Sequence, residues 1–591
     1  MCRRTISCLL AAAVALTIGS GRSDSRQAPP PTAAGSLQGL AEEYYGWLLQ
    51  DDYYTRLKAG LPVERLPDLS LAKSQADAAR AQALAARVAA VTETGLAHDD
   101  WLTRQLLLHQ LGLTAKAPRF YWLEPVITPY RCPLPMVQLV FTTYRFHGRA
   151  DLEHYLALLR QYPGLVRTLL DIVRTQRQKG IVLPRDEIAL VVPFLSSMVT
   201  APEQSPFFVA DSRLVGVDRD DGRTFQGEVA AEIRSGIAPA IEELVAFVKT
   251  DYASSAPVSV GVWQYPGGRE YYRELVRVHT GTDLTPSRIH EIGLSEVARL
   301  RHELDLARQA CGFAGTLPAF MHLLRTDPRF FPASPDEVGQ RLLSVVERVR
   351  PKVGQFFRHT PRAPYGVRRL PASLEGGQTF GYYQQPTSAE PTGYYLFNGS
   401  DLAHRSLLNA AALILHELVP GHHFQICLAA ENSALPAFRR EAAYTGYVEG
   451  WGDYASELGR DMGIYADPWA LCGRLAMDLF VSARLVVDTG MNDLGWSREK
   501  AIDYMRENTL ETDAQIGTET LRYACDMPGQ ALAYKIGSRR LLELRAAAKR
   551  RLGTRFDIRA FHDWVLGSGA MPLSLLDAHV DWEILEALSG K

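Results

Sequence analysis

The chain has 591 residues, of which 47% are hydrophobic and 22% are charged, as in ordinary soluble globular proteins. Its formal net charge is −2, so electrostatics gives no reason to expect nucleic acid or an anionic membrane as a partner. The length alone is compatible with two to four domains.

The N-terminal residues follow the order of a secretory signal. Arg3 and Arg4 precede the apolar run ISCLLAAAVALTIGSG, which is too short to cross a bilayer, and the polar stretch RSDSRQAPPPTAAGS comes next. A buried N-terminal helix is the less favoured alternative. We therefore predict a signal peptide over residues 1–22 and a flexible linker over 23–36. The expected protein is periplasmic or secreted, without stable membrane insertion after cleavage.

Five cysteines would remain after cleavage, and none of them forms a C-x-x-C pair. They are Cys132, Cys311, Cys427, Cys472 and Cys525. Scattered thiols of this kind form neither a disulfide scaffold nor a thiolate metal site, and an odd number leaves at least one unpaired within the chain. Their pairing stays open.

Most of the remaining chain has helical patterning. Residues 71–91 are rich in alanine and contain no glycine or proline, and residues 290–310 and 334–353 space their apolar positions by three and four. The residues TPSR before the second segment are typical of a helix start. We find no βα rhythm, phosphate loop or repeat, and we predict a single, mainly α-helical domain over residues 37–591, arranged in two lobes.

Strand-like sequence is clearest over residues 378–398. There the aromatic segments TFGYY and GYYLF flank a polar loop that contains proline. This pattern predicts a β-hairpin, and hence a small sheet in a helical protein. Asp401 follows soon after, and we expect it to cap a helix that runs directly into the next motif.

Residues 413–425, LILHELVPGHHFQ, are similar to an H-E-x-x-H metal motif, except that Pro420 stands where the second histidine would be. In a regular helix, histidines four residues apart share one face and converge on one ion. His422, six residues after His416, would point away by roughly 120°, and His423 would lie about 10 Å along the axis. A straight helix therefore cannot bring either histidine to a metal that His416 also binds.

Pro420 and Gly421 change this geometry. Proline lacks an amide hydrogen and clashes with the carbonyl four residues back, and glycine accepts conformations that other residues avoid. We expect the pair to loop out residues so that His422 becomes the second ligand, with His423 as the second choice. The other His-Glu pairs of the chain, at 290–291 and 302–303, have no histidine within the next ten residues. A helix end with hydrogen-bonded histidines is the alternative.

A carboxylate on a following helix would complete the site. Glu449 lies 27 residues after His422, and a His2Glu set leaves the fourth position of tetrahedral zinc open for water. Asp453 and Glu457 continue the same helix face and could orient the histidine ligands. A solvated acidic face is the alternative, but the aromatic residues interleaved with these acids would be poorly placed in water.

Glu417, next to the ligand His416, is the predicted general base. It would take a proton from the attacking water and pass it to the leaving amine. The predicted cofactor is one Zn²⁺ per chain, because zinc lowers the pKa of bound water to about 7.

At these residues the sequence resembles the bacterial family called domain of unknown function 885, through three blocks in the family's order. The first runs from His416 to Gln425, and the second from Glu449 to Glu457. The third contains Arg522, Tyr523, Pro528, Gly529, Gln530, Ala531, Tyr534 and Gly537. The resemblance covers nearly all of residues 40–588.

That family is similar in turn to helical gluzincin peptidases of the thimet-oligopeptidase and carboxypeptidase Taq type. This likeness implies a metallopeptidase-like helical shell around a deep cleft, zinc at its floor, and a small sheet that offers an edge to an extended peptide. It also makes Tyr523, Tyr534 and Arg522 candidates for stabilising the oxyanion, with packing as their alternative role. The expanded motif, with two residues inserted, departs from those peptidases.

The predicted function is a secreted zinc metallopeptidase that hydrolyses short peptides. Two alternatives stay open: a metal-dependent hydrolase of a non-peptide amide or ester, and a non-catalytic peptide-binding protein with a relic site. The sequence makes no prediction of the oligomeric state.

Overall fold

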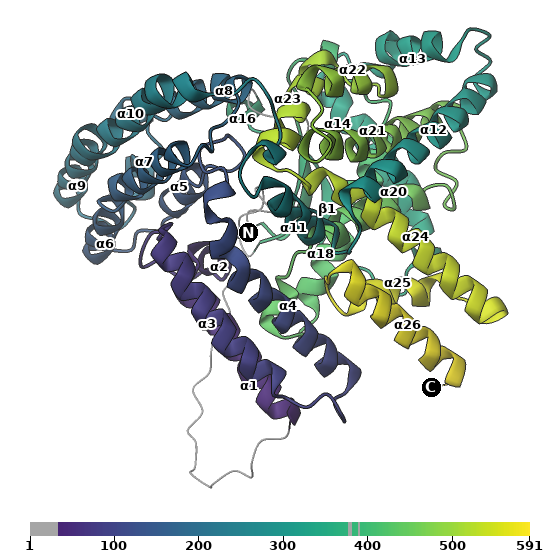
Figure 1. Cartoon of the computed structure of the whole chain (residues 1–591), viewed down its shortest axis with the longest axis horizontal. Coiled ribbons are helices and arrows are strands. Elements are labelled where there is room, and N and C mark those ends of the chain that lie inside the picture. The colour runs from purple at the N-terminus through teal and green to yellow at the C-terminus, as the bar shows by residue number, and fades with distance from the viewer. Residues whose placement is uncertain (1–32, 376–380, 388–389, 591) are drawn as a thin grey trace.

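The computed structural model describes residues 33–375, 381–387 and 390–590, and it is mainly helical with one small sheet (Figure 1). The mainly α-helical prediction is confirmed. The predicted signal peptide and residues 23–32 of the predicted linker lie outside the described residues. The last four linker residues, 33–36, belong instead to the first helix, because the helix that buries Leu37 extends back through two alanines.

The N-terminal part of the chain forms two groups of helices. One packs α1, α3 and α4 side by side, and the other gathers α5 to α10 on one side of the molecule (Figure 1). The bounds are α1 Ala33–Asp51, α2 Tyr53–Lys58, α3 Leu71–Ala89, α4 His98–Phe120, α5 Leu134–Thr142, α6 Arg149–Leu159, α7 Tyr162–Gln178, α8 Arg185–Ser196, α9 Arg219–Glu232 and α10 Ala238–Phe247.

The later helices lie mostly on the opposite side from α5 to α10 (Figure 1), and the division into two lobes stays a prediction. There α12 packs along α21, α20 along α24, and α24 against α26. The bounds are α11 Gly268–Thr280, α12 Pro286–Ala310, α13 Leu317–Thr326, α14 Pro335–Val349, α15 Val353–Phe356, α16 Ala372–Glu375, α17 Ala410–Glu417, α18 His422–Glu431, α19 Ala437–Arg440, α20 Thr445–Leu458, α21 Pro468–Asn492, α22 Arg498–Asn508, α23 Asp513–Leu521, α24 Ala533–Leu552, α25 Ile558–Gly567 and α26 Leu573–Ser589.

The three helices predicted over residues 71–91, 290–310 and 334–353 are present as α3, α12 and α14. Their starts follow from local caps: the side chain of Thr285 accepts a hydrogen bond from the N–H of Arg288, and that of Ser334 accepts one from Glu337. Pro351 lies in the short 3₁₀ turn Arg350–Lys352 just after α14. The helix therefore ends before the predicted boundary at 353, as a following proline favours.

The sheet has three strands in the order β1-β3-β2. β2 (Tyr382–Gln384) and β3 (Gly393–Phe397) pair antiparallel, so the predicted hairpin is confirmed where it is described; residues 378–380 and 388–389 lie outside the described part. β1 (Tyr365–Arg369) pairs parallel with β3 and was not predicted. Because β3 is central, β2 is an edge strand.

The prediction that Asp401 caps the helix of the motif is wrong. Asp401 has φ 51° and ψ 44°, whereas an N-cap residue needs an extended backbone, and its carboxylate pairs with His404. A 3₁₀ turn, Leu402–His404, follows, and α17 begins only at Ala410. The alanine-rich and leucine-rich run that starts there favours helix without a side-chain cap.

Buried apolar residues form three clusters, and α21 contributes to all of them. Its Leu485 belongs to the central cluster, Val487 to the cluster beneath α5 to α10, and Leu475 to the cluster beneath α13. Side chains of α21 are therefore packed against buried residues of all three clusters. No helix in the described part of the chain combines the length and apolar character that a bilayer crossing needs.

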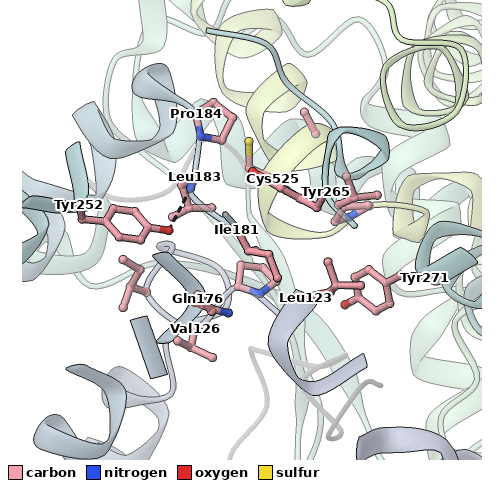
Figure 2. A pocket seen from close by; sticks show the side chains of 15 residues that line it. Leu123, Val126, Gln176, Ile181, Leu183, Pro184, Tyr252, Tyr265, Tyr271 and Cys525 are labelled. Atoms are coloured by element: carbon pink, nitrogen blue, oxygen red, sulfur yellow. Dashed lines mark hydrogen bonds between the residues drawn. The ribbon is translucent and has the colours of Figure 1, made fainter. Parts of the chain in front are cut away.

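A small pocket of about 30 Å³ lies between the N-terminal helices and the segment 524–528 (Figure 2). It is lined mainly by apolar and aromatic side chains, including Ile181, Tyr252, Tyr265 and Cys525. A volume of this size holds about two water molecules. It contains none of the predicted metal ligands, and the deep cleft at the metal site stays a prediction.

Candidate metal centre

The motif forms two helices separated by a sharp turn. α17 ends at Glu417, the Val419–Pro420 peptide bond is cis, and α18 begins at His422. Pro420 cannot continue the helix because its ring would clash with the carbonyl of His416, four residues back. A Cβ at Gly421 would lie only 1.7 Å from that same carbonyl oxygen, so the turn closes tightly on the end of α17.

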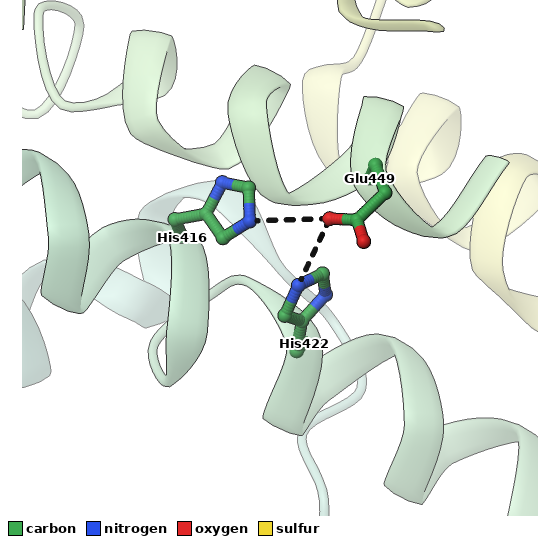
Figure 3. A group of neighbouring side chains, drawn as sticks. All are labelled: His416, His422 and Glu449. Carbon is green, nitrogen blue, oxygen red and sulfur yellow. Dashed lines mark ion pairs between the residues drawn. The ribbon is translucent and has the colours of Figure 1, made fainter. Parts of the chain in front are cut away.

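Three predicted ligand side chains converge at this turn (Figure 3). His416 Nε2 and His422 Nε2 each lie 3.5 Å from the same oxygen, Oε2, of Glu449 on α20. The imidazole centroids are 4.6 Å apart with an interplanar angle of 81°. The three ligand atoms lie within 4.8 Å of one another, and the described residues contain no second group of three His, Cys or carboxylate side chains at this spacing.

The charges of this cluster are mutually stabilising. Burial acts to raise the pKa of Glu449, yet the hydrogen bonds with His416 and His422 hold it well below its usual range. Burial acts to lower the pKa of His422, yet the bond to Glu449 raises it. Nδ1 of each histidine is buried without a hydrogen-bond partner among the described residues. Both rings therefore make their described polar contacts through Nε2, on the side of the carboxylate.

Glu417 lies between this cluster and the sheet. It is half-buried, and its carboxylate accepts a hydrogen bond from the backbone N–H of Tyr383 on the edge strand β2. Burial raises the pKa of Glu417, and the positive charges of His422 and His416 act in the opposite direction. The residue is thus a carboxylate beside two imidazoles with its pKa shifted toward neutrality, as a general base requires.

His423, the second choice as ligand, is not part of the cluster. Its Nδ1 bonds to the Tyr383 hydroxyl at 2.8 Å, and its Nε2 bonds to the carbonyl of Ala363 at 3.0 Å. Both ring nitrogens are therefore engaged with the sheet and the segment before it. His423 anchors α18 to the sheet, while the preceding residue His422 faces Glu449.

The family model described as "Bacterial protein of unknown function (DUF885)" matches residues 54–580. The chain belongs to this family. Among curated proteins, none matches the sequence significantly.

Two solved structures are similar to this DUF885 chain over almost its full length. One is a candidate lipoprotein from Colwellia psychrerythraea, with 27% identity, a TM-score of 0.85, and coverage of 94% of this chain and 100% of the other. The second is a candidate lipoprotein of unknown function from Shewanella oneidensis, with 17% identity, a TM-score of 0.71, and coverage of 93% and 99%. The second likeness shows the fold alone.

Trp451, in the second block of this DUF885 chain, holds the turn in place. Its indole is fully buried, and Nε1 donates to the carbonyls of Pro420 at 2.9 Å and Gly421 at 3.2 Å. α20 therefore supplies both the carboxylate Glu449 and a hydrogen-bond donor to the turn that separates the histidines. The sequence placed Trp451 among the buried aromatic residues and in the family's second block, but it gave no indication of the hydrogen bonds to the turn.

The prediction that Asp453 and Glu457 orient the histidines is wrong. Arg474 Nη1 donates to Asp453 at 3.1 Å, Arg474 Nε donates to Glu457 at 3.2 Å, and Ser538 donates to Asp453 at 2.7 Å. The full burial of Asp453 also excludes a solvated acidic face at that position. Because Arg474 of α21 binds both carboxylates, neither is directed at the histidines. The same hydrogen bonds, with that of Ser538, link α20 to α21 and α24.

Tyr534 is the oxyanion candidate that lies beside the cluster. Its ring stacks on that of His416, with centroids 6.1 Å apart and an interplanar angle of 17°. Burial raises the pKa of its hydroxyl, the nearby Glu449 charge acts in the same direction, and a hydrogen bond with the Gln530 side chain acts against them. The hydroxyl therefore stays protonated at neutral pH and available as a donor.

Tyr523 and Arg522 belong to the π-helical turn Arg522–Asp526. Tyr523 is fully buried and bonds to Glu519 and to Nε of Arg484. Arg522 bonds to Glu519 and, through Nη2, to Gln530 at 2.7 Å. Neither residue has a described contact with the three ligand side chains. Arg484, which sequence reasoning missed, places its guanidinium 5.0 Å from the centre of the Tyr534 ring.

Proposed function

We propose that this chain is an extracytoplasmic, metal-dependent peptidase that hydrolyses short peptides with Glu417 as general base. The observation that carries this proposal is the convergence of His416 Nε2 and His422 Nε2 on one oxygen of Glu449, at 3.5 Å each. Four-coordinate zinc has bonds of about 2.0–2.1 Å at tetrahedral angles, which places ligand atoms about 3.3 Å apart. The donor set and spacing fit zinc.

Zinc at this site would supply Lewis-acid chemistry, which polarises water and a carbonyl group. The chain's own residues would do the rest. Glu417 accepts the proton of the attacking water and returns it to the leaving amine. The Tyr383 N–H, which bonds to its carboxylate, fixes the orientation of the base. Tyr534, protonated and stacked on His416, donates to the oxygen that becomes negatively charged.

Two further observations favour a peptide as substrate and a location outside the cytoplasm. β2 is an edge strand directly beside Glu417, and such an edge can pair with an extended peptide. The Colwellia psychrerythraea protein, which is 27% identical, is described as a candidate lipoprotein, a class exported from the cytoplasm. Together with the signal-like N-terminal residues, this likeness supports export.

The experiment is peptide hydrolysis and metal content of wild type and Glu417→Gln. We expect about one zinc per chain in both proteins, and a roughly 10²- to 10⁴-fold lower rate in the variant, because only the proton transfer is removed. The matched control is Glu291→Gln, which changes another His-Glu pair whose carboxylate is exposed and pairs with Arg288.

Equal activity of wild type and Glu417→Gln would exclude the proposed base. If wild type hydrolyses small amides or esters but no peptide of a mixed library, the alternative hydrolase is favoured over the peptidase. Peptide binding without metal and without turnover would favour the relic site.

A further inference from the structure

Two arginines, Arg484 and Arg522, lie next to Tyr534. Arg484 of α21 places its guanidinium 5.0 Å from the centre of the Tyr534 ring, which itself stacks on His416 at 6.1 Å. Arg522 reaches the same tyrosine through Gln530, which accepts from Arg522 Nη2 and bonds to Tyr534. At about 3.3 Å per residue, an extended peptide covers the separation between His416 and Arg484 with at most about three residues.

The direct ion pairs of these arginines leave one positive charge uncompensated. Arg484 Nη2 donates to Glu519 at 3.1 Å, and Arg522 Nη1 donates to the two oxygens of the same carboxylate at 3.3 and 3.4 Å. One carboxylate therefore serves two guanidinium groups. Tyr523 donates its hydroxyl to Glu519 as well and accepts from Nε of Arg484, so it adds no negative charge at neutral pH.

Other acids near the pair are only partly ionised at neutral pH. Burial raises the pKa of Glu511, Asp488 and Asp526 to about 7 in each case. A half-ionised acid compensates a permanent guanidinium charge incompletely. An uncompensated buried charge is unfavourable, and a bound anion would remove the penalty.

Arg522 has the free donor that an anion would use. Its Nε is buried and has no hydrogen-bond partner among the described residues, although the side chain as a whole keeps 15% of its surface exposed. Tyr130, 40% exposed, places its ring 5.5 Å from the Arg522 guanidinium. A partly exposed guanidinium that also has an unused N–H is suited to a carboxylate.

We propose that Arg522, with Arg484 behind it, binds the C-terminal carboxylate of the substrate, so that this chain removes residues from the C-terminal end of short peptides. The inference rests on the proposed function and adds its substrate class. It assigns Arg522 to recognition of the substrate in place of oxyanion stabilisation. Tyr534, which contacts both Arg484 and His416, keeps the oxyanion role.

The test uses one peptide that wild type hydrolyses, made in three forms: with a free C-terminal carboxylate, with a C-terminal carboxamide, and with a carboxamide after a C-terminal glutamate. We expect wild type to prefer the free acid over the carboxamide by roughly 10- to 100-fold in kcat/KM, mainly through KM, as loss of a charge-assisted hydrogen bond predicts. Arg522→Gln is expected to remove this preference, so that the ratio of kcat/KM for free acid and carboxamide approaches one.

Arg522→Lys is the second variant, because it keeps the charge and loses the fixed donor geometry, and it should retain part of the preference. The matched control is Arg506→Gln, which changes a surface arginine that pairs with Asp513. Equal kcat/KM for free acid and carboxamide in wild type would overturn the inference while the peptidase stands. Equal preference for the glutamate carboxamide and the free acid would overturn the assignment to the C-terminus.

If wild type hydrolyses none of the three peptides, the proposed peptidase function fails, and this result alone does not decide whether Arg522 binds a carboxylate. The inference is then decided by calorimetric binding of the same peptides to zinc-loaded Glu417→Gln. Tighter binding of the free acid, lost in Glu417→Gln/Arg522→Gln, supports the carboxylate site. Equal binding of free acid and carboxamide overturns it.

Discussion

The imidazole of His416 lies directly against the backbone of Gly452. A Cβ at position 452 would lie 2.7, 2.8 and 2.9 Å from three atoms of this ring, closer than such contacts occur in proteins. Gly452 is three residues after Glu449 and on the same face of α20. The missing side chain therefore lets α20 approach α17 closely enough for Glu449 to reach both histidines.

Gly452→Ala is expected to displace the His416 ring, because the added methyl group and the ring cannot occupy the same space. We expect zinc affinity, measured by competition with a chromophoric chelator, to fall by roughly 10- to 100-fold, the effect usually seen when the support of a ligand is changed. Gly112→Ala in α4, where a Cβ would contact nothing within 4 Å, is the control. Unchanged affinity in Gly452→Ala would contradict the idea that this glycine positions His416.

At the scale of elements, α20 and α24 cross with their backbones in contact. A Cβ at Gly450 would lie 2.5 Å from the Cα of Gly537, and a Cβ at Gly537 would lie 2.0 Å from the carbonyl oxygen of Gly446. The hydrogen bond from Ser538 to Asp453 joins the same two helices. Since Tyr534 lies one turn before Gly537, this crossing brings Tyr534 to the histidines.

Gly450→Ala is expected to destabilise the protein, because the obstructing atom is backbone and cannot rotate away. Overpacking of this kind costs roughly 1–3 kcal/mol, and it should appear as a lower melting temperature in a thermal scan. Gly227→Ala in α9 is the matched control, since its Cβ would meet nothing within 4 Å. If Gly450→Ala melts at or above the wild-type temperature, the helix crossing can accommodate the added methyl group and the expectation is wrong.

Local signals explain which elements could be predicted from the sequence. The caps Thr285 and Ser334 act within their own first turns, so the starts of α12 and α14 were readable. β1 was not, because its residues YGVRR have no alternating pattern and pair with β3, which lies more than twenty residues later. Aspartate is a residue type that favours the N-cap position, but the left-handed backbone conformation of Asp401 could not be read from its residue type.

The candidate site divides in the same way. His416, His422 and Glu449 could be selected because their types and spacings suit a metal, and Pro420 indicated the break between helices. The contacts of Asp453 could not be foreseen, because its partner Arg474 lies on another helix. Arg484 was missed for the same reason: its position beside Tyr534 comes from the packing of α21, and no motif contains it.

At the scale of the whole molecule, several histidines are buried in neutral form away from the candidate metal centre. His562 bonds to the carbonyl of Phe356 at 2.9 Å and to the Tyr454 hydroxyl at 2.8 Å, and burial lowers its pKa to about 3. Burial also lowers the pKa of His279 to about 3. In the unfolded chain both would titrate near 6.5. The unfolded state therefore binds more protons than the folded state between about pH 6.5 and 3.

The contribution of each such histidine to the free energy of unfolding is expected to be complete above pH 6.5 and to be lost as the solution is acidified toward pH 3, by at most about 1.4 kcal/mol per pH unit. Urea denaturation at pH 7, 6 and 5 measures this slope. His562→Asn should flatten it, whatever its effect on absolute stability, and the exposed His359→Asn should not. The same pH dependence of the midpoint in wild type and in His562→Asn would contradict the neutral burial of His562.

The sharp turn between α17 and α18 has a consequence for metal selectivity. In a continuous helix the separation of two ligands is fixed by the helical repeat, whereas here it depends on the backbone dihedral angles of residues 418–421. Small rotations in these few residues change the opening between the imidazoles with both helices intact. We therefore expect this short segment, together with the position of Glu449 on α20, to set the ionic radius that the proposed centre accepts.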